Sequence, residues 1–335
     1  MNTIYQEDIE NIVTSTLIDW GKFSNKTFLI TGASGLLGGA IVDAIKYRNE
    51  YFDANIKIII LVHKNSKFSE DKNVSIISGE IDKFNIGDNI DYIIHAAAPT
   101  KSSFFVENPV ETMDAIILGT RNILEIAKKS KIKSMIYLSS MEVYGSIDDL
   151  ALTEEKLGFV SLKSVRSSYS EAKRASELYC HVFANEYDVP VKMARLAQVF
   201  GSGVSLNDNR LPNYIVKSIL NEENIILKSD GMSSVNFCYI SDAVKAIFLL
   251  LQKGNNGESY NICGNTTGLN IKELCELLIR RFDSKIKLQI LGENQNEFAP
   301  TTKMFLLNGK IKKIGWSPEY GIFEAYDRLM EYYRS

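Results

Sequence analysis

Short apolar runs rich in β-branched residues alternate with longer amphipathic stretches between residues 26 and 140, and no other feature constrains the fold as strongly. The apolar runs are residues 26–31, 56–62, 74–77, 92–95 and 135–139. Helices are expected at 35–47 and 109–129, the second with apolar residues at a helical period. Strands separated by helices are typical of βαβ units with a buried parallel sheet. The sequence therefore predicts an α/β fold with a doubly wound parallel Rossmann sheet.

The segments before and after this pattern differ from it. Residues 4–20 carry Ile9, Ile12 and Val13 at helical spacing, which predicts an additional helix over an edge of the fold or at a subunit contact. After residue 196 the chain is richer in loops, with helices expected at 214–220, 242–251 and 270–282. The expected division is an N-terminal helical extension at 1–25, a dinucleotide-binding Rossmann domain at 26–196 to which 237–263 return, and a smaller C-terminal α/β substrate-binding lobe at 197–236 and 264–335.

A glycine-rich turn joins the first apolar run to the first expected helix. Residues 31–38 read TGASGLLG. The unpaired N–H groups at a helix N-terminus favour anions, and glycine allows the backbone to approach a pyrophosphate closely. The residues expected to contact the dinucleotide here are Gly32, Ser34, Gly35, Leu36, Leu37 and Gly38. Glycines at a tight strand–helix turn also occur without a ligand, but the strand before and the helix after favour a binding function.

The end of the second apolar run bears on which dinucleotide binds. In the NAD fingerprint an acidic residue stands there and accepts hydrogen bonds from the ribose 2′-hydroxyl. Here the sequence is Leu-Val-His-Lys-Asn over residues 61–65, with His63 and Lys64 at the tip. A lysine in that position favours a 2′-phosphate. The preferred cofactor is therefore NADP(H), although NAD(H) is possible if Lys64 is only a solvated loop residue.

Residues 167–173 read SSYSEAK and contain the one tyrosine of the chain that is followed four positions later by a lysine. With 16 tyrosines and 38 basic residues, about one such pair is expected by chance. On a helix, Tyr169 and Lys173 lie on one face. Hydride transfer at a carbinol needs a group that exchanges the hydroxyl proton, and a neighbouring lysine lowers the pKa of a phenol from about 10. The pair is either catalytic or a coincidence of one helix face.

A second polar group follows the apolar run at 135–139. Residues 135–144 read MIYLSSMEVY, so Ser139 and Ser140 are expected at the carboxyl edge of the sheet, where open α/β folds bind ligands. A serine hydroxyl there can hydrogen-bond the substrate oxygen and fix its position. The expected helix with Tyr169 begins soon afterwards in the sequence.

Taken in order, these motifs resemble the extended short-chain dehydrogenase/reductase family, whose members act largely on nucleotide-activated sugars. The motifs are TGASGLLG, HAAAP at 95–99, SSMEVYG at 139–145, YSEAK at 169–173 and FCYISDAV at 237–244. The resemblance runs from about residue 26 to near the end of the chain. It is strongest to the branch of UDP-glucuronate decarboxylases, dTDP-glucose 4,6-dehydratases and NAD-dependent epimerase/dehydratases.

The resemblance implies roles for individual residues. Tyr169 would be the acid/base, Lys173 would lower its pKa and hold the nicotinamide ribose, and Ser140 would orient the substrate oxygen. The cofactor would also contact the alanines of the HAAAP motif, Ala96, Ala97 and Ala98. Either Glu80 or Asp82 would lie beside the adenine.

The chain departs from its relatives at positions that decide the reaction. Dehydratases resembling it carry Asp-Glu after the catalytic Ser/Thr, where this chain has Met141-Glu142, and a thioether cannot donate a proton. Decarboxylases resembling it carry an arginine where this chain has Val235. Glu142 is either a second acid/base or a residue that positions the loop. The side chains expected to contact the substrate are Ser139, Met141, Arg166, Gln198 and Arg210, with Arg195 as a further candidate for its anionic part.

Arg166 matches an arginine of the decarboxylase branch, but a helix-capping role on the surface fits it equally well. The segments 201–212 and 292–302 are expected to set the specificity for the sugar.

These observations favour an NADP(H)-dependent oxidoreductase that reduces a keto group of a nucleotide-activated sugar in surface-polysaccharide biosynthesis. Hydride would come from the nicotinamide and the proton from Tyr169, while Ser140 holds the oxygen. The alternative is an epimerase or decarboxylase that retains NAD. A third hypothesis is a non-catalytic sensor that binds a dinucleotide. The complete Ser-Tyr-Lys set argues against it.

Composition limits the partners. A net charge of -3 and a pI near 5.8 give no general attraction for nucleic acid. No basic start with an apolar run and no apolar stretch of about twenty residues is present, so we expect a cytoplasmic protein without a membrane partner. The four cysteines lack CxxC spacing, which predicts buried thiols and no metal site. The family resemblance implies a homodimer formed as a four-helix bundle by 109–129 and 169–183.

Overall fold

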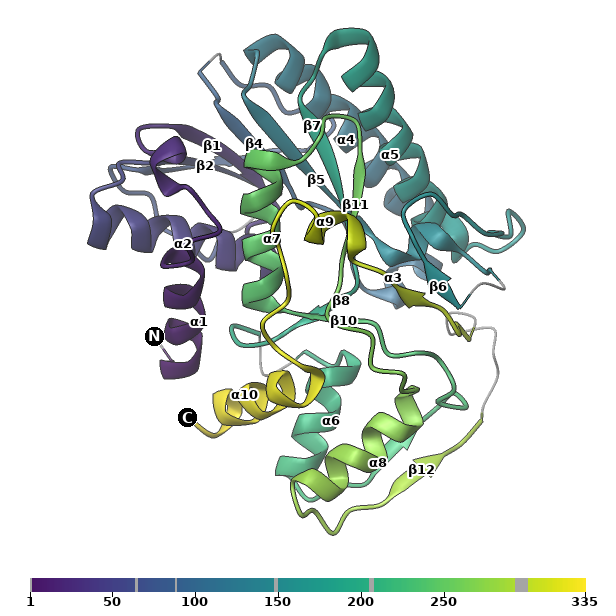
Figure 1. Cartoon of the computed structure of the whole chain (residues 1–335). Helices are drawn as coiled ribbons and strands as arrows, with labels where there is room; N and C mark the ends of the chain where they lie inside the picture. The colour runs from purple at the N-terminus through teal and green to yellow at the C-terminus, as the bar shows by residue number, and fades with distance from the viewer. Residues whose placement is uncertain (1, 64–65, 88, 148–149, 205–207, 293–300) are drawn as a thin grey trace.

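A seven-stranded sheet, parallel at every pairing, forms the centre of the computed structural model (Figure 1). The structure describes residues 2–63, 66–87, 89–147, 150–204, 208–292 and 301–335. The strands, in spatial order, are β3 (Val74–Ser78), β2 (Lys57–Val62), β1 (Thr27–Thr31), β4 (Tyr92–His95), β5 (Ser134–Ser140), β7 (Val191–Leu196) and β11 (Ser259–Ile262). The chain order reverses between β1 and β4, as in a doubly wound Rossmann fold. The predicted fold class is confirmed.

Helices cover both faces of this sheet. Helices α2 (Leu36–Phe52) and α7 (Ile240–Lys253) share one hydrophobic cluster with Phe28 and Ile30 of β1. Helices α4 (Pro109–Ser130) and α5 (Ser167–Tyr187) contribute to a second cluster, which contains Leu29 of the same strand. This alternation follows from the two-residue period of a strand. Both faces of the sheet are therefore packed.

The N-terminal segment forms a shorter helix than the sequence predicts. Helix α1 (Thr3–Val13) ends at Thr14, and a 3-10 turn, η1, follows at Trp20–Phe23. Residues 14–16 are Thr-Ser-Thr, whose hydroxyls compete for backbone hydrogen bonds and whose β-branched members disfavour a helix. Helix α1 packs against α2, α7 and α10 (Ile322–Arg334).

The remaining elements lie at the carboxyl end of the sheet or flank it. They are α3 (Ser102–Glu107), η2 (Met141–Tyr144), β6 (Ala151–Leu152), β8 (Gln198–Phe200), α6 (Leu211–Leu220), β9 (Ile225–Leu227), β10 (Phe237–Tyr239), α8 (Ile271–Arg281), β12 (Leu288–Ile290), β13 (Phe305–Leu306) and α9 (Gly309–Lys312). Figure 1 shows α6, α8 and β12 grouped together below the sheet. The helices expected at 214–220, 242–251 and 270–282 correspond to α6, α7 and α8.

The small strands tie distant parts of the chain together. Strand β8 pairs with β10, β9 with β12, and β6 with β13, all in parallel. The four cysteines are buried, as predicted. Within the described part of the chain, no helix has the length and apolar character that a membrane span requires.

Candidate active site

The glycine turn between β1 and α2 brings two backbone segments unusually close. Gly32 has a φ of +73°, and a Cβ there would lie 2.6 Å from the carbonyl carbon and oxygen of Ala96. A Cβ on Gly38 would lie 2.3 Å from the carbonyl oxygen of Gly32. Gly35 precedes α2 at the N-cap position and carries no side chain that could occupy the anion site. This cradle fits the pyrophosphate of a dinucleotide.

The ribose whose 2′-hydroxyl distinguishes NAD from NADP would lie at the end of β2. An NAD fingerprint carries an acidic residue there, and this chain carries His63. His63 is exposed, and its Nε2 lies 3.0 Å from Oε1 of Glu80. Glu80, one of the residues predicted to lie beside the adenine, is thus paired with His63, while Asp82 is partly buried. Lys64, on which the prediction of NADP(H) depends, lies outside the described residues.

The HAAAP motif lies against the glycine turn. The hydroxyl of Thr31 accepts a hydrogen bond of 3.1 Å from the backbone N–H of Ala97. Ala96 and Ala98 line a large cleft at the carboxyl ends of β1, β4 and β5. Their small side chains leave room above the sheet edge, consistent with the predicted contact with a cofactor.

The cleft has a volume of about 1450 Å³. It brings together most of the residues singled out from the sequence, although they are distant in the chain. The predicted site residues that line it are Gly32, Gly35, Leu36, Leu37, Gly38, Ala96, Ala98, Ser139, Ser140, Met141, Glu142, Arg166, Tyr169, Lys173, Gln198 and Arg210, and Val235 lines it too. Ser34, His63 and Ala97 are not among its lining residues.

Tyr169 is buried at the start of α5 and stacks on the ring of Phe105 at 4.2 Å, with an angle of 11° between the ring planes. Burial raises the pKa of the Tyr169 phenol above its usual value, and the charge of Glu142 raises it further. A hydrogen bond with the Ser140 side chain acts in the opposite direction. Ser140 and Tyr169 therefore lie within hydrogen-bonding reach of each other.

Lys173 lies one turn further along α5 and is also buried. Its Nζ donates a hydrogen bond of 2.7 Å to the carbonyl oxygen of Leu138 and lies 5.8 Å from the centroid of the Tyr169 ring. Burial lowers the pKa of Lys173 to about 8. In this structure burial and Glu142 raise the pKa of the phenol, while Ser140 and Arg166 lower it; lowering by Lys173 stays a prediction.

Glu142 forms a forked ion pair with Arg166. The guanidinium donates hydrogen bonds of 2.8 and 3.0 Å to the two carboxylate oxygens, and the Ser170 hydroxyl donates another at 3.2 Å. Burial alone would lower the pKa of Arg166, but the bonds and charge of Glu142 raise it. The Arg166 side chain forms no capping hydrogen bond to α5, and it lines the cleft. Of the substrate-contacting and helix-capping roles that the sequence leaves open, this position fits the first.

Two other predicted arginines differ in their surroundings. Arg195 is buried and donates to Glu177 at 2.7 Å, to Tyr144 at 3.1 Å and to the carbonyl oxygen of Glu154 at 2.7 Å. These partners occupy its guanidinium, so the suggestion that Arg195 binds an anionic substrate group is not supported. Arg210 is half-exposed, pairs with Asp208 and begins α6.

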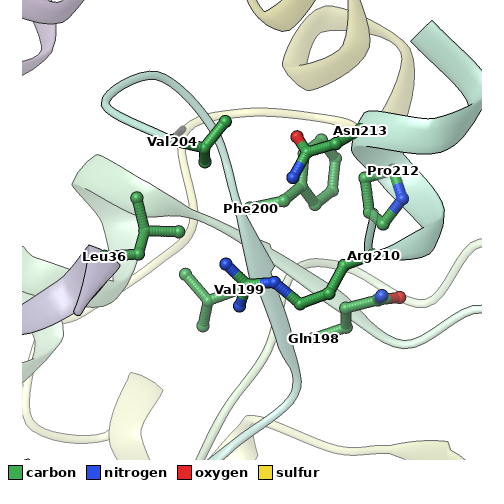
Figure 2. Close-up of a pocket in the computed structure, with 8 residues that line it drawn as sticks. All are labelled: Leu36, Gln198, Val199, Phe200, Val204, Arg210, Pro212 and Asn213. Atoms are coloured by element: carbon green, nitrogen blue, oxygen red, sulfur yellow. The ribbon is translucent and has the colours of Figure 1, made fainter. Parts of the chain in front are cut away.

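Figure 2 shows Arg210 facing Gln198 and Val199 of β8 across a small crevice that Leu36 of α2 also lines. The crevice places the start of α6 beside the glycine turn.

Sequence reasoning missed the partners that hold the site. Nothing in the sequence singles out Phe105 as the ring that stacks on Tyr169, and the pairing of Glu142 with Arg166 spans 24 positions. Ser170 adjoins Tyr169 in the YSEAK motif and was detectable only as a neighbour. Ser139 is buried, and its hydroxyl finds no hydrogen-bond partner among the described residues.

Comparison with known proteins extends these observations. UDP-glucuronic acid decarboxylase 6 of Arabidopsis thaliana is 26% identical over 319 residues, which cover 93% of this chain and 90% of the relative. UDP-glucuronic acid decarboxylase 1 of Danio rerio is 25% identical, covering 92% of this chain and 72% of the relative. Among solved structures, UDP-glucose 4-epimerase of Thermotoga maritima superposes with a TM-score of 0.78 at 22% identity, covering 92% of this chain and 98% of the other.

The dTDP-glucose 4,6-dehydratase of Bacillus anthracis, solved in complex with NAD, gives a TM-score of 0.74 at 22% identity, covering 92% of this chain and 96% of the other. At these identities the solved structures support the fold. Residues 28–263, which include the glycine turn, the SSMEVYG motif and the Tyr169–Lys173 pair, match the model of one family. The predicted resemblance to nucleotide-sugar-modifying short-chain dehydrogenases and the prediction of an enzyme are thereby confirmed. The chain belongs to the NAD dependent epimerase/dehydratase family.

Proposed function

We propose that this protein is an epimerase that acts on a nucleotide-activated sugar and retains NAD through each turnover. One observation carries the proposal: Ser140, Tyr169 and Lys173 are assembled in the cleft, while Met141 and Val235 line the same cleft with apolar side chains. Met141 supplies no acid for the loss of water, and Val235 supplies no guanidinium for a carboxylate. Removal and return of a hydride at a ring hydroxyl needs neither group.

The chain's own residues would handle the proton of that hydroxyl. Tyr169 takes the proton as the carbinol becomes a ketone and gives it back when the ketone is reduced, and the Ser140 hydroxyl holds the oxygen. Lys173 adds a positive charge that favours the phenolate. The glycine turn, Ala96 and Lys173 would hold the dinucleotide, which would supply the acceptor and donor of hydride. Hydride added to the opposite face of the ketone gives the epimer without net redox change.

The proposed substrate class depends on the curated relatives, whose names specify UDP-glucuronic acid, and on the cleft. Arg210 stands at the N-terminus of α6, where the helix favours a phosphate group; its Nε and Nη2 donate to Asp208, so a phosphate would compete with that carboxylate for the guanidinium. The cleft of about 1450 Å³ has room for a dinucleotide together with a second nucleotide. Glu142, oriented by its forked ion pair with Arg166, would accept a hydrogen bond from a sugar hydroxyl.

A second candidate is net reduction of a ketosugar by NADP(H), the function that the sequence favours, in surface-polysaccharide biosynthesis. The observation in its favour is the end of β2, where His63 stands in place of an acidic residue and is itself paired with Glu80. A tip without a free carboxylate tolerates a 2′-phosphate.

The deciding experiment measures cofactor and product on the same preparation. Purified protein is denatured and its released dinucleotide is identified and quantified. The native protein is then incubated with UDP-glucose, UDP-N-acetylglucosamine, UDP-glucuronate or dTDP-glucose without added cofactor, and products are separated chromatographically. Copurified NAD and an epimer formed without NADPH would support the proposal. Cofactor-free protein that binds NADPH more tightly than NADH and reduces a ketosugar would establish the reductase instead.

The proton-transfer assignment is tested by Tyr169→Phe. We expect turnover to fall by about a thousandfold, because a positioned general acid–base typically contributes about 10²–10⁴-fold. NAD affinity, measured by nicotinamide fluorescence, should change little. Full activity of the variant would exclude Tyr169 as the acid/base.

We also propose that the chain forms a homodimer through α4 and α5. The outward faces of these packed helices expose Val110, Met113, Leu178 and Val182. An exposed apolar face of this kind is typical of an interface, and two such pairs would form a four-helix bundle. Sedimentation velocity of the wild type and of Leu178→Glu would test it, since a charge at the centre should give monomers. The cytoplasmic location stays a prediction.

A further inference from the structure

Asp8 of α1 is a buried carboxylate outside the cleft, with only 1% of its surface exposed. Its Oδ2 accepts hydrogen bonds from the hydroxyls of Ser202 and Tyr239, the latter at 2.7 Å. Its Oδ1 accepts bonds of 2.8 and 3.1 Å from Nη2 and Nε of Arg328. A buried carboxylate is costly unless it is paired and hydrogen-bonded in this way. Asp8 is therefore a junction between segments that are distant in the sequence.

Three segments that are far apart in the sequence meet at Asp8. Ser202 lies in the turn that follows β8, Tyr239 ends β10, and Arg328 belongs to α10. A second contact of α1 reinforces the first: Gly203 has a φ of +82°, and a Cβ there would lie 2.5 Å from the ring of Tyr5.

The hydroxyl of Tyr5 donates a hydrogen bond of 2.6 Å to Asp43 of α2. Helix α1 thus connects the helix that follows the glycine turn to the turn at residues 201–204. Figure 1 shows α1 lying between α2 and the end of the chain at α10.

The turn at 201–204 leads from one wall of the cleft to another. Before it, Gln198 and Phe200 of β8 line the cleft, and after it come Arg210 and the start of α6. Figure 2 shows the ring of Phe200 beside Asn213 and Pro212 of α6, with Val204 to their left. Because Val204 of the turn lines the same crevice as Val199 of β8 and Arg210, the position of the turn bears on the spacing between β8 and Arg210.

We propose that α1 is a latch that holds the turn at 201–204 in the position for substrate binding, with Asp8 as its positioning residue. The inference rests on the proposed function to the extent that the nucleotide portion of the substrate is taken to bind beside Arg210. Asp8 touches neither the cleft nor the Tyr169 pair, so its effect should fall on nucleotide binding and leave proton transfer unchanged.

The first test measures hydrogen–deuterium exchange on the full chain and needs no ligand. Asp8→Asn removes the charge of the junction, and Ser202→Ala removes only the hydroxyl from the turn and leaves Asp8 paired with Arg328. Glu7→Gln is the matched control, because Glu7 is a neighbouring carboxylate on the same helix that contacts Arg328 at 3.2 Å but is half-exposed.

We expect exchange in peptides covering 197–204 to rise at least about tenfold in Asp8→Asn and Ser202→Ala, with no change in β1 or β5. Glu7→Gln should match the wild type. Unchanged exchange at 197–204 in both Asp8→Asn and Ser202→Ala would overturn the latch, whatever the substrate. Loss of protection throughout the sheet in both would show a purely structural role and would overturn it as well.

The second test measures dissociation constants by calorimetry with UDP, dTDP and NAD as probes. In both latch variants, affinity for UDP should fall by about tenfold, within the usual range of coupling between sites, while affinity for NAD stays constant. An equal loss for UDP and NAD, or no loss for either, would contradict the latch. If the wild type binds neither UDP nor dTDP, the proposed function fails, and the exchange measurement still decides whether α1 holds the turn.

Discussion

Two carboxylate–guanidinium pairs involve residues at or near α5, and they differ in what surrounds them. Glu177 and Arg195 are 9% and 7% exposed, and their closest atoms are 2.7 Å apart. Glu142 and Arg166 are 30% and 13% exposed, with a closest approach of 2.8 Å. The distances are nearly equal, so geometry alone does not separate the pairs. Burial and the remaining partners do.

The remaining partners show what each pair is available for. Arg195 also donates to Tyr144 and to the carbonyl oxygen of Glu154, so its nitrogens are directed inside the fold. Arg166 contacts Glu142 alone among charged groups, and its Nε has no hydrogen-bond partner within the described part of the chain. A guanidinium with a full set of internal partners supports the structure, whereas Arg166 lines the cleft and orients Glu142 there.

The largest expected effect comes from breaking the buried pair. Arg195→Met leaves Glu177 without its cation in a site with little water, which should lower the free energy of unfolding by about 3–5 kcal/mol. The measurement is urea denaturation followed by circular dichroism. Glu177→Gln combined with Arg195→Met removes both charges and should recover part of the loss. A single variant as stable as the wild type would contradict the assignment of this pair to the structure.

Arg166→Met is expected to affect activity rather than stability. The free energy of unfolding should change by less than about 1 kcal/mol, because the pair is partly solvated. Turnover should fall by about a hundredfold, because Glu142 loses the fork that orients it beside Tyr169. Arg166→Lys, which keeps the charge without the fork, should recover little. Unfolding and steady-state kinetics on one preparation distinguish this outcome from a structural role, in which stability and rate would fall together.

The same comparison explains how much of the molecule the sequence could predict. The sheet and its main helices depend on local patterns, so strands such as β4 fall where the apolar run lies, and the glycine turn is recognisable because conformation requires glycine there. The Ser140–Tyr169–Lys173 set was predictable because its spacing is fixed by one helix and one strand end.

The pairing of charges was not predictable, since it depends on side chains brought together by the fold. Arg195 and Arg166 look alike in the sequence, and only the position of β7 beside α5 assigns the first to Glu177. The end of α1 was predicted too far along the chain because apolar spacing continues to Ile18, while the Thr-Ser-Thr stretch ends the helix. The Asp8 junction joins residues up to 320 positions apart, and no local pattern reveals it.

Lys173 and Lys192 extend the comparison to single charges. Burial lowers the pKa of each to about 8, and neither forms an ion pair among the described residues. Lys192 donates to the Ser134 hydroxyl at 2.8 Å and lies at the opposite end of the sheet from the cleft. At pH 7 both ammonium groups oppose folding, so Lys173→Met and Lys192→Met should each stabilise by about 1–2 kcal/mol, less than the full shift because a hydrogen bond is lost. Thermal unfolding would measure this.

The smallest expected effect is on pH dependence, and it separates the two lysines. Between pH 8 and 10.5 the unfolded chain binds more protons at these lysines than the folded chain does, so their contribution to stability rises with pH across that window. Activity should move the other way. Above pH 8, Lys173 loses the charge that favours the Tyr169 phenolate, so turnover should decline while stability still increases.

Lys192→Met should keep the decline in turnover and lose part of the rise in stability, since Lys192 makes no contact with the cleft. Turnover and the free energy of unfolding can therefore both be measured from pH 6 to 10.5 on the same protein and compared. A decline in turnover that disappears in Lys192→Met, or a wild-type rate that keeps rising with pH through this range, would show that the ammonium of Lys173 is not the group whose charge supports catalysis.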